Sequence, residues 1–155
     1  MLDSKIKTAL ELYQNGYNCA QSVIGAYRDY LGKSTDLLMD MAAGFGGGMG
    51  KLQQTCGAVT GAFMVLSSLN NQKHAGAKDQ LDQDIQHFAH LFRKKHGELN
   101  CKALIRYDLS SEEGIQQARD DQVFEKRCSG FVEHAVEVLY ELLSQDHYPK
   151  VGIKS

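Results

Sequence analysis

The chain contains no tryptophan, a single proline and no long uninterrupted apolar run. The proline, Pro149, lies near the end of the sequence, so no proline breaks a helix in the body of the chain. The longest apolar stretch, 56–69, includes a threonine and two serines and is too short to span a bilayer, which excludes a membrane-spanning helix there. Long runs of alternating apolar and polar residues are also missing, which argues against a β-sheet fold.

The charge of the sequence is balanced. Its 17 basic and 19 acidic residues give a net charge of −2, and no basic block is present. This balance gives no support for binding to nucleic acid or to an anionic membrane surface, so we expect neither as a partner. The segment 1–12 has a polar-faced helical pattern without the apolar core of a signal peptide, and we therefore expect a cytoplasmic protein.

The length and composition are those of one globular domain. A chain of 155 residues is long enough to bury a real core, and 43% hydrophobic with 23% charged residues is ordinary for such a protein. We expect a single domain over 1–155, with its core at about 3–144 and a C-terminal tail at 145–155. Apolar residues recur at helical spacing nearly throughout, which predicts an all-α bundle of about six to seven helices.

Capping residues and glycines divide this pattern into separate helices. The predicted helices lie between Ser4 and Gly16, Asn18 and Gly32, Ser34 or Thr35 and Gly44, Cys56 and Leu69, Asp79 and Gly97, and Cys128 and Leu143, with shorter ones after Asn100 and after Ser110 or Ser111. The polar segment 70–78 is predicted to be a loop.

A glycine-rich loop precedes the buried central helix. The loop does not match a dinucleotide-binding fingerprint, because Met49 stands at the position of the last glycine and no strand precedes the loop. It does not match a P-loop either, because Phe45 stands at the position of the first glycine and Leu52 at that of the Ser or Thr. We interpret the loop as a tight backbone path against another helix or a small ligand. Small residues one turn apart on the central helix also allow another backbone to approach closely. The candidate ligand- or cofactor-binding glycines are Gly46, Gly47, Gly48, Gly57 and Gly61.

The four cysteines are Cys19, Cys56, Cys101 and Cys128, and no two form a Cys-x-x-Cys pair. Their spacing does not support a zinc ribbon or a thioredoxin-type motif, and a static disulfide framework is not expected in a reducing compartment. On the predicted boundaries each cysteine lies in the first turn of a helix, where unpaired N–H groups and the helix dipole stabilise a thiolate and lower the pKa of the thiol. Four basic residues nearby in sequence add positive charge: Lys51, Lys102, Lys126 and Arg127. The alternative interpretation is that the cysteines are small buried hydrophobic residues.

Histidines offer weaker candidates for chemistry. His87 and His90 lie one turn apart on the amphipathic helix predicted from Asp79, with Asp84 one turn before them. That arrangement is a possible metal-binding face, but a solvated polar face is the favoured interpretation. Nothing specific supports a cysteine–histidine hydrolase.

The cysteine and glycine motifs resemble a known family. They are Gly16-Tyr-Asn-Cys19-Ala-Gln, Gly44-Phe-Gly-Gly-Gly-Met-Gly50 and Cys56-Gly-Ala-Val-Thr-Gly61, followed by single cysteines at Cys101 and Cys128. Over roughly 16–143 the sequence resembles the C_GCAxxG_C_C family, whose members are described as redox-active proteins with four cysteines. The resemblance implies that the family's four cysteines are carried here by Cys19, Cys56, Cys101 and Cys128. It also implies an association with transporter-linked pathways and with electron-transfer proteins.

Three functional hypotheses follow. The first is a thiol–disulfide or electron-transfer protein, in which a cysteine of lowered pKa, with Cys56 as the first candidate, reacts and a second cysteine resolves it. Four cysteines allow three pairings, and the sequence does not choose among them. The second is an iron–sulfur or zinc site formed by the same four cysteines. The third is a non-enzymatic helical module that packs against a partner, such as a transporter component, or against a second copy in a homodimer.

Overall fold

The computed structural model describes residues 1–70 and 74–150, and in this part of the chain the secondary structure is helical. Its only β-pairing is an isolated antiparallel bridge between Thr55 and Asn100. The α-helices are α1 (Leu2–Gln14), α2 (Cys19–Ala26), α3 (Arg28–Leu31), α4 (Ser34–Met41), α5 (Gly57–Leu69), α6 (Ala77–His96), α7 (Cys101–Ile105), α8 (Glu112–Asp120) and α9 (Ser129–Leu143). A 3₁₀ turn, η1 (Ala42–Gly44), follows α4, and a π-helix, η2 (Phe124–Cys128), precedes α9. The predicted all-α single domain is confirmed.

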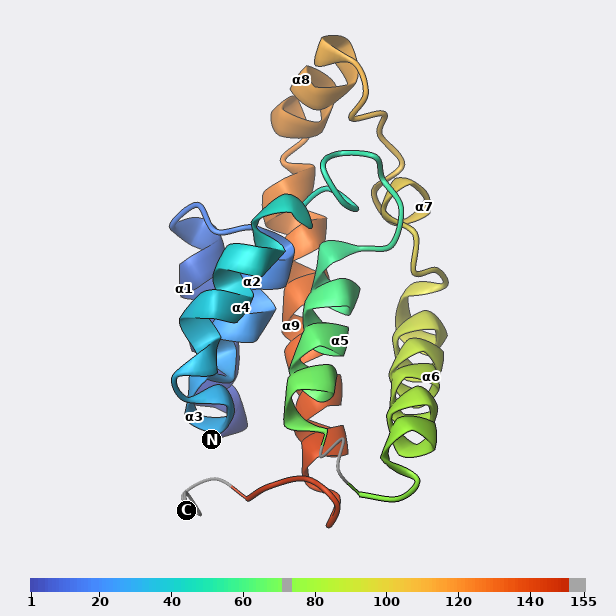
Figure 1. Ribbon diagram of the computed structural model, residues 1–155. Helices are drawn as coiled ribbons and strands as arrows, with labels where there is room; N and C mark the ends of the chain where they lie inside the picture. Colours follow the sequence, from blue (N-terminus) through green and yellow to red (C-terminus); the bar gives the residue numbers. More distant parts are fainter. Residues whose placement is uncertain (71–73, 151–155) are drawn as a thin grey trace.

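Helices α5 and α9 form the centre of the bundle. Figure 1 shows α1, α2 and α4 on one side of this pair and α6 on the other. Contacts of α9 with α1, α5 and α6, and of α2 with α5, join the helices into one body. Because α1 and α2 run in opposite directions, as do α4 and α5, the N-terminal ends of α2 and α5 lie at the same end of the bundle as η2 and the loop 45–56 (Figure 1).

Two glycines allow α5 to pack directly against the backbone of α2. A Cβ atom at Gly61 would lie 2.7 Å from the carbonyl oxygen and 2.8 Å from the Cα atom of Ala20. One turn earlier, a Cβ at Gly57 would lie 2.9 Å from the carbonyl oxygen of Phe45 and 3.2 Å from the Cβ of Cys19. Real Cβ atoms do not approach backbone so closely, so both positions require glycine for this packing. The Cys-Gly-Ala-x-x-Gly motif therefore sets the separation of α2 and α5.

The glycine-rich loop folds back on itself. The carbonyl groups of 44–48 accept hydrogen bonds from the backbone N–H groups of 49–51, 53 and 54. Gly48 has a φ of 64°, and a Cβ there would lie 2.7 Å from the Cα of Gln53 and 2.8 Å from the Cβ of Cys101. The loop is therefore a closely packed structure and not an open turn.

Gln53 fastens this loop to the connection between α7 and α8. Its buried side chain donates from Nε2 to the carbonyl oxygen of Tyr107 at 2.7 Å, and its Oε1 accepts from the N–H of Leu109 at 2.8 Å. Both polar ends of the amide are thus satisfied in the interior, which a buried amide requires for stability.

Most predicted helix boundaries are confirmed. Asn18 caps α2 with a reciprocal capping box, Asn100 caps α7, and Ser111 caps α8. The central helix, α5, ends at Leu69 as predicted. These boundaries depend on local capping chemistry, which the sequence carries directly.

Some boundaries differ from the prediction. Helix α1 begins at Leu2, and Ser4 lies inside it with its hydroxyl bonded to the carbonyl of Met1. The second predicted helix is divided at Tyr27, whose hydroxyl donates to the carbonyl of Val136 on α9 at 2.6 Å. Of the predicted loop 70–78, residues 71–73 lie outside the described residues, and the last two residues belong to α6.

The C-terminal segment packs on α6 through the buried carboxylate of Asp84. Tyr148 is buried and donates from its hydroxyl to Asp84 Oδ2 at 2.5 Å, and His147 Nε2 lies 2.9 Å from the same oxygen. Residues 145–150, which the sequence analysis assigned to a tail, are thus held against the domain. In the described residues, no helix is both long enough and apolar enough to cross a membrane.

Two histidines lie inside the contact between α6 and α9. The rings of His96 and His134 are 4.8 Å apart between centroids, and both contact Phe92, His134 stacked on its ring and His96 tilted against it. His96 Nε2 and His134 Nδ1 are buried without a hydrogen-bond partner. Burial lowers the pKa of each histidine from 6.5 to about 4, so both rings are neutral at physiological pH.

We predict that Gly61→Ala destabilises the protein by about 1–3 kcal/mol, because the new Cβ overlaps the backbone of α2. The matched control is Gly130→Ala on α9, where a Cβ would meet nothing within 4 Å. This control is expected to be neutral or to stabilise by about 0.5–1 kcal/mol, since alanine is the better helix former. Chemical denaturation measures both variants, and equal effects would contradict the packing role of Gly61.

We also predict that the free energy of unfolding falls as the pH is lowered from 6.5 towards about 4, because the unfolded chain protonates its histidines in this window while the folded protein keeps His96 and His134 neutral. The double variant His96→Leu/His134→Leu should show a shallower fall. Denaturation at a series of pH values tests this. Parallel curves for the two proteins would show that this pair does not determine the slope.

Candidate functional site

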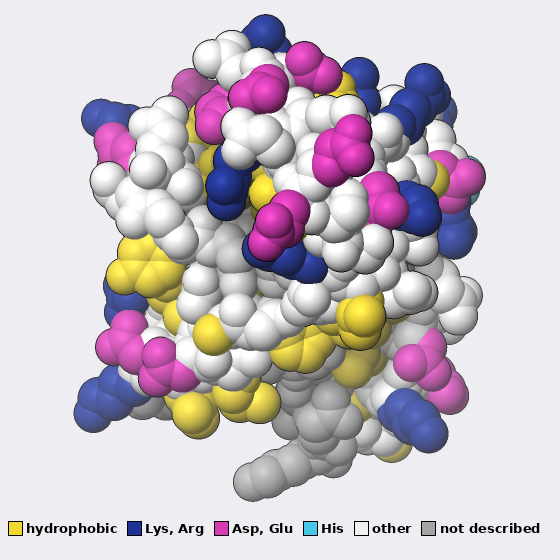
Figure 2. Space-filling view, turned by 90° about the horizontal axis from the view of Figure 1, so that it is seen from above, with side chains coloured by type: hydrophobic (Ala, Val, Ile, Leu, Met, Phe, Trp, Pro, Cys, Tyr) yellow, Lys and Arg dark blue, Asp and Glu magenta, His cyan; other side chains and the backbone are white. Residues whose placement is uncertain are grey.

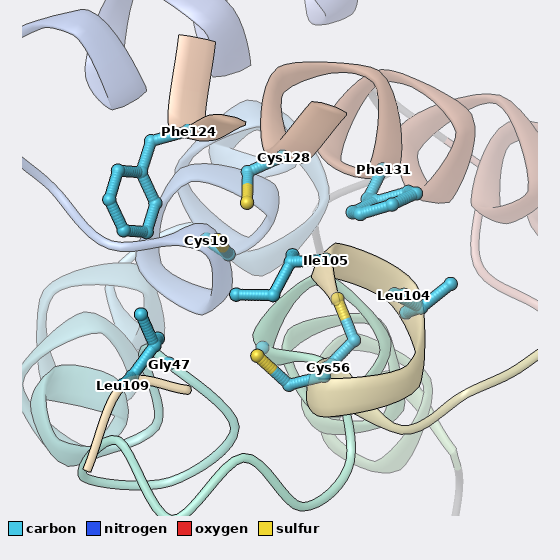
Figure 3. A pocket seen from close by; sticks show the side chains of 11 residues that line it. Cys19, Gly47, Cys56, Leu104, Ile105, Leu109, Phe124, Cys128 and Phe131 are labelled. Atoms are coloured by element: carbon cyan, nitrogen blue, oxygen red, sulfur yellow. The ribbon is translucent and has the colours of Figure 1, made fainter. Parts of the chain in front are cut away.

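All four cysteines line one small enclosed cavity at the loop end of the bundle. The cavity has a volume of about 40 Å³ and mostly apolar walls. Figure 3 shows Cys19, Cys56 and Cys128 approaching it from different elements, beside Ile105 and Phe124. The complete lining consists of Cys19, Gly47, Cys56, Gly57, Cys101, Leu104, Ile105, Leu109, Phe124, Cys128 and Phe131. The fold thus brings four cysteine side chains from distant parts of the sequence to one apolar cavity.

Three of these cysteines lie at helix N-termini, as predicted. Cys19 is the first residue of α2, Cys56 is the N-cap residue of α5, and Cys101 is the first residue of α7. The isolated β-bridge between Thr55 and Asn100 connects the last two. On either side of it, the N–H of Cys56 donates to the carbonyl of residue 99, and the N–H of Cys101 to that of residue 54, each at 2.7 Å. This short ladder holds Cys56 and Cys101 next to each other.

Cys128 is placed differently from the prediction. It is the last residue of the π-helix η2, which continues directly into α9, so it does not lie at a free helix start. The boundary prediction was wrong here because the helical path begins at Phe124. A π-turn widens the backbone by one residue per turn and commonly occurs at functional sites.

Burial decides the ionisation of Cys56 and Cys101. It raises the pKa of the Cys56 thiol from 9.0 to about 12, although the backbone N–H groups of Ala58 and Val59 favour the thiolate. Burial likewise raises the pKa of Cys101 to about 11, against a hydrogen bond from Gln53. The expectation that Cys56 has a lowered pKa is therefore wrong. The loss of hydration destabilises the thiolate more than the helix N-terminus stabilises it.

Cys128 is the cysteine that favours the thiolate. Its pKa is lowered from 9.0, first by a hydrogen bond from the Cys19 thiol and then by one from the Tyr13 hydroxyl, with burial opposing both. The same hydrogen bond, together with burial, raises the pKa of Cys19. The negative charge of Glu125 raises the pKa of Cys128, and the positive charge of Arg127 lowers it by less. Cys19 and Cys128 are thus linked: their interaction favours the thiolate of Cys128 and the protonated thiol of Cys19.

The predicted ligand-binding glycines have different surroundings. Gly47 and Gly57 line the cysteine cavity, and Gly46 and Gly47 line an adjoining groove. Gly48 is packed between the loop backbone and Cys101. Gly61 lies a turn further down α5, against α2.

A metal site was a second expectation for the cysteines. Four thiols around one cavity are a donor set that soft metal ions prefer. In the described residues, however, no three or more Cys, His, Asp or Glu side chains are placed to coordinate a common ion. This finding also covers His87 and His90, which are exposed on α6, while the carboxylate of Asp84 is bound to Tyr148.

Sequence reasoning missed several residues of this site. Tyr13 was predicted only as part of an apolar face, yet its hydroxyl, which donates to the carbonyl of Phe124 at 3.1 Å, also contributes to lowering the pKa of Cys128. Leu109 and Ile105 close the cavity from the region around α7. No local signal marks these residues, because their roles depend on contacts with distant parts of the chain.

We predict that Cys19→Ala raises the pKa of Cys128, because it removes the principal hydrogen bond to the thiolate, and that Tyr13→Phe raises it by less. At neutral pH the thiolate population should fall several-fold in the first variant. Ultraviolet absorbance of the thiolate, followed against pH, measures the change. Tyr17→Phe, which alters an exposed tyrosine, is the matched control and should leave the first titration step unmoved.

Comparison with known protein families gives a match over most of the chain. The model of the family described as "Putative redox-active protein (C_GCAxxG_C_C)" matches residues 17–142, which is most of the chain and includes all four cysteines. Neither the curated proteins nor the solved structures contain a significant match. Because the family model covers most of the chain, including the four cysteines and the close-packed glycines of α5, the chain belongs to the C_GCAxxG_C_C family.

Proposed function

We propose that this protein is a thiol–disulfide redox protein whose reactive dithiol is the pair Cys19–Cys128. The observation that carries the proposal is that Cys19 and Cys128 line one cavity and shift each other's pKa in opposite directions, that of Cys128 downward and that of Cys19 upward. This favours the Cys19–Cys128 pair over the other combinations of two cysteines, with Cys128 as the member that forms a thiolate more readily. Reactivity in thiol–disulfide exchange requires a thiolate and a second sulfur within reach.

The proposed reaction moves two electrons from the protein to a disulfide substrate. The Cys128 thiolate attacks one sulfur of the substrate, a mixed disulfide forms, and the first substrate thiolate leaves and takes up a proton from water. Cys19 then loses its proton and attacks the Cys128 sulfur, which forms the Cys19–Cys128 disulfide and releases the second substrate thiol. The sum is one dithiol and one disulfide converted into one disulfide and two thiols, and the reverse reaction reduces the protein.

Tyr13 and Arg127 act in this scheme as positioning residues. The Tyr13 hydroxyl stabilises the Cys128 thiolate before attack, and Arg127 adds a positive charge beside it. The guanidinium of Arg127 is itself held by the carbonyl oxygen of Ile105 at 2.9 Å. Cys56 and Cys101 stay protonated at neutral pH, because burial raises the pKa of each thiol.

A thiolate metal centre is the second candidate function. The observation that favours it is that four cysteines line one apolar cavity, whereas a simple dithiol mechanism needs only two. Binding of an ion or cluster would require the four side chains to move together, since the described residues offer no ready coordination group. Cys56 and Cys101, idle in the dithiol reaction, would then be ligands. For this reason the two candidates predict different roles for that second pair.

Oxidation mapping tests the proposal. We expect the reduced protein, treated with a mild excess of a small disulfide, to form a Cys19–Cys128 bond that peptide mass spectrometry identifies. Cys128→Ser should abolish disulfide formation at this site and Cys19→Ser should stop at the mixed disulfide, because no resolving thiol remains. A Cys56–Cys101 bond formed while Cys19 and Cys128 stay reduced would refute the proposed pair.

The matched control is Cys56→Ser, which leaves the reactive pair intact and should retain oxidation. The metal content of protein purified without oxygen separates the second candidate. Near-stoichiometric iron or zinc that is lost in Cys56→Ser would favour the metal centre, and metal-free protein that cycles through Cys19 and Cys128 would favour the dithiol.

A further inference from the structure

A second, larger hollow opens directly outside the cysteine cavity. It is a groove of about 460 Å³ between the glycine-rich loop and α8, within the size range of small-molecule sites. Figure 2 looks onto this end of the molecule and shows Lys and Arg side chains interspersed with Asp and Glu side chains, with hydrophobic atoms between them. The groove thus has room for a compound the size of a short peptide, whereas the cavity behind it does not.

The polar side chains that line this groove favour an anion. Lys51 from the glycine-rich loop and Arg119 from α8 are its charged residues, and no acidic residue lines it. Some basic residues pair with carboxylates, as Lys5 does with Asp29 at 2.6 Å. Neither Lys51 nor Arg119 has an ion-pair partner among residues 1–70 and 74–150, so both charges are available to a ligand.

The backbone of the loop adds further donors. The carbonyls of Gly46, Gly47 and Gly48 accept hydrogen bonds within the loop, but their N–H groups find no acceptor in the described part of the chain. Gly46 and Gly47 line the groove. Successive unbonded N–H groups next to a cation are a common way for proteins to bind carboxylate or phosphate oxygens. This observation is independent of the two side-chain charges.

The groove and the cysteine cavity share a wall. Gly47, Leu109 and Phe124 line both, so the groove and the cavity adjoin at these three residues. Phe124 belongs to the same π-helix as Cys128, four residues before it in sequence. A molecule bound in the groove therefore lies next to the element that carries the thiolate.

We propose that this groove binds the carboxylate groups of a small anionic disulfide or thiol, through Lys51, Arg119 and the N–H groups of Gly46 and Gly47, and presents its sulfur to the cavity across Gly47 and Phe124. The inference rests on the proposed function, because it assigns a substrate class to the same cysteine pair. Electrostatic attraction raises both the affinity and the rate of encounter for such a substrate.

The first test compares three small disulfides of different charge. Reduced protein is mixed with oxidised glutathione, which is anionic, with hydroxyethyl disulfide, which is neutral, and with cystamine, which is cationic. The rate of Cys19–Cys128 formation, divided by the rate of each disulfide with a free small thiol, should be highest for oxidised glutathione. Added salt should lower that rate and leave the rate of the neutral compound unchanged.

The second test uses the variant Lys51→Gln/Arg119→Gln. We expect its rate with oxidised glutathione to fall about tenfold, because two charge-assisted contacts are lost, and its rate with hydroxyethyl disulfide to stay the same. The matched control is Arg93→Gln/Lys94→Gln, which removes the same charge from the exposed face of α6 and should change either rate by less than about twofold.

Binding without chemistry separates this inference from the proposed function. S-methylglutathione keeps the carboxylates but has no free thiol, and Cys128→Ser removes the nucleophile. An NMR titration of this variant should move the amide signals of Gly46 and Gly47, and the groove double variant should bind about tenfold more weakly. Shifts without any dithiol oxidation would retain the groove and refute the redox pair. Oxidation at equal corrected rates with all three disulfides, without these shifts, would refute the groove.

Discussion

The close approach of α5 to α2 is the packing constraint on which the rest of the site depends. Gly57 and Gly61 remove the side chains that would hold the two helices apart. Their contact brings the start of α5 against Cys19 and leaves the glycine-rich loop to cover the end of the bundle. The cysteine motif and the helix-packing motif are therefore the same stretch of chain. A change in the helix spacing would also change the distances between sulfurs.

The sequence predicts the local parts of this structure well. Helix caps at Asn18, Asn100 and Ser111 bond groups within three residues of themselves, so their chemistry can be recognised without a fold. The proximity of Cys19 and Cys128 cannot be predicted from the local sequence. It is set by how α1 and α2 pack on α9, over a separation of roughly a hundred residues. The role of Tyr13 cannot be predicted from the sequence for the same reason.

The ionisation of the cysteines shows where local reasoning fails. A helix N-terminus favours a thiolate, and on that ground Cys56 was the first candidate nucleophile. The structure buries it, and desolvation outweighs the backbone N–H groups around it. Cys128 lacks the helix-start advantage, but it receives hydrogen bonds from Cys19 and Tyr13. Burial and hydrogen-bond partners, which only the fold supplies, therefore decide which cysteine favours the thiolate.

Cys19 and Cys128 lie near opposite ends of the sequence, and this separation along the chain has a thermodynamic consequence. A covalent bond between them would close a loop containing most of the chain, including α5 and α6. In the chain-entropy model, a loop of about a hundred residues stabilises the folded state by about 4–5 kcal/mol, mainly by restricting the unfolded chain. Net domain stabilities are about 5–15 kcal/mol. The oxidised protein would thus outlast the reduced one under proteolysis, and its lifetime would record the redox conditions around it.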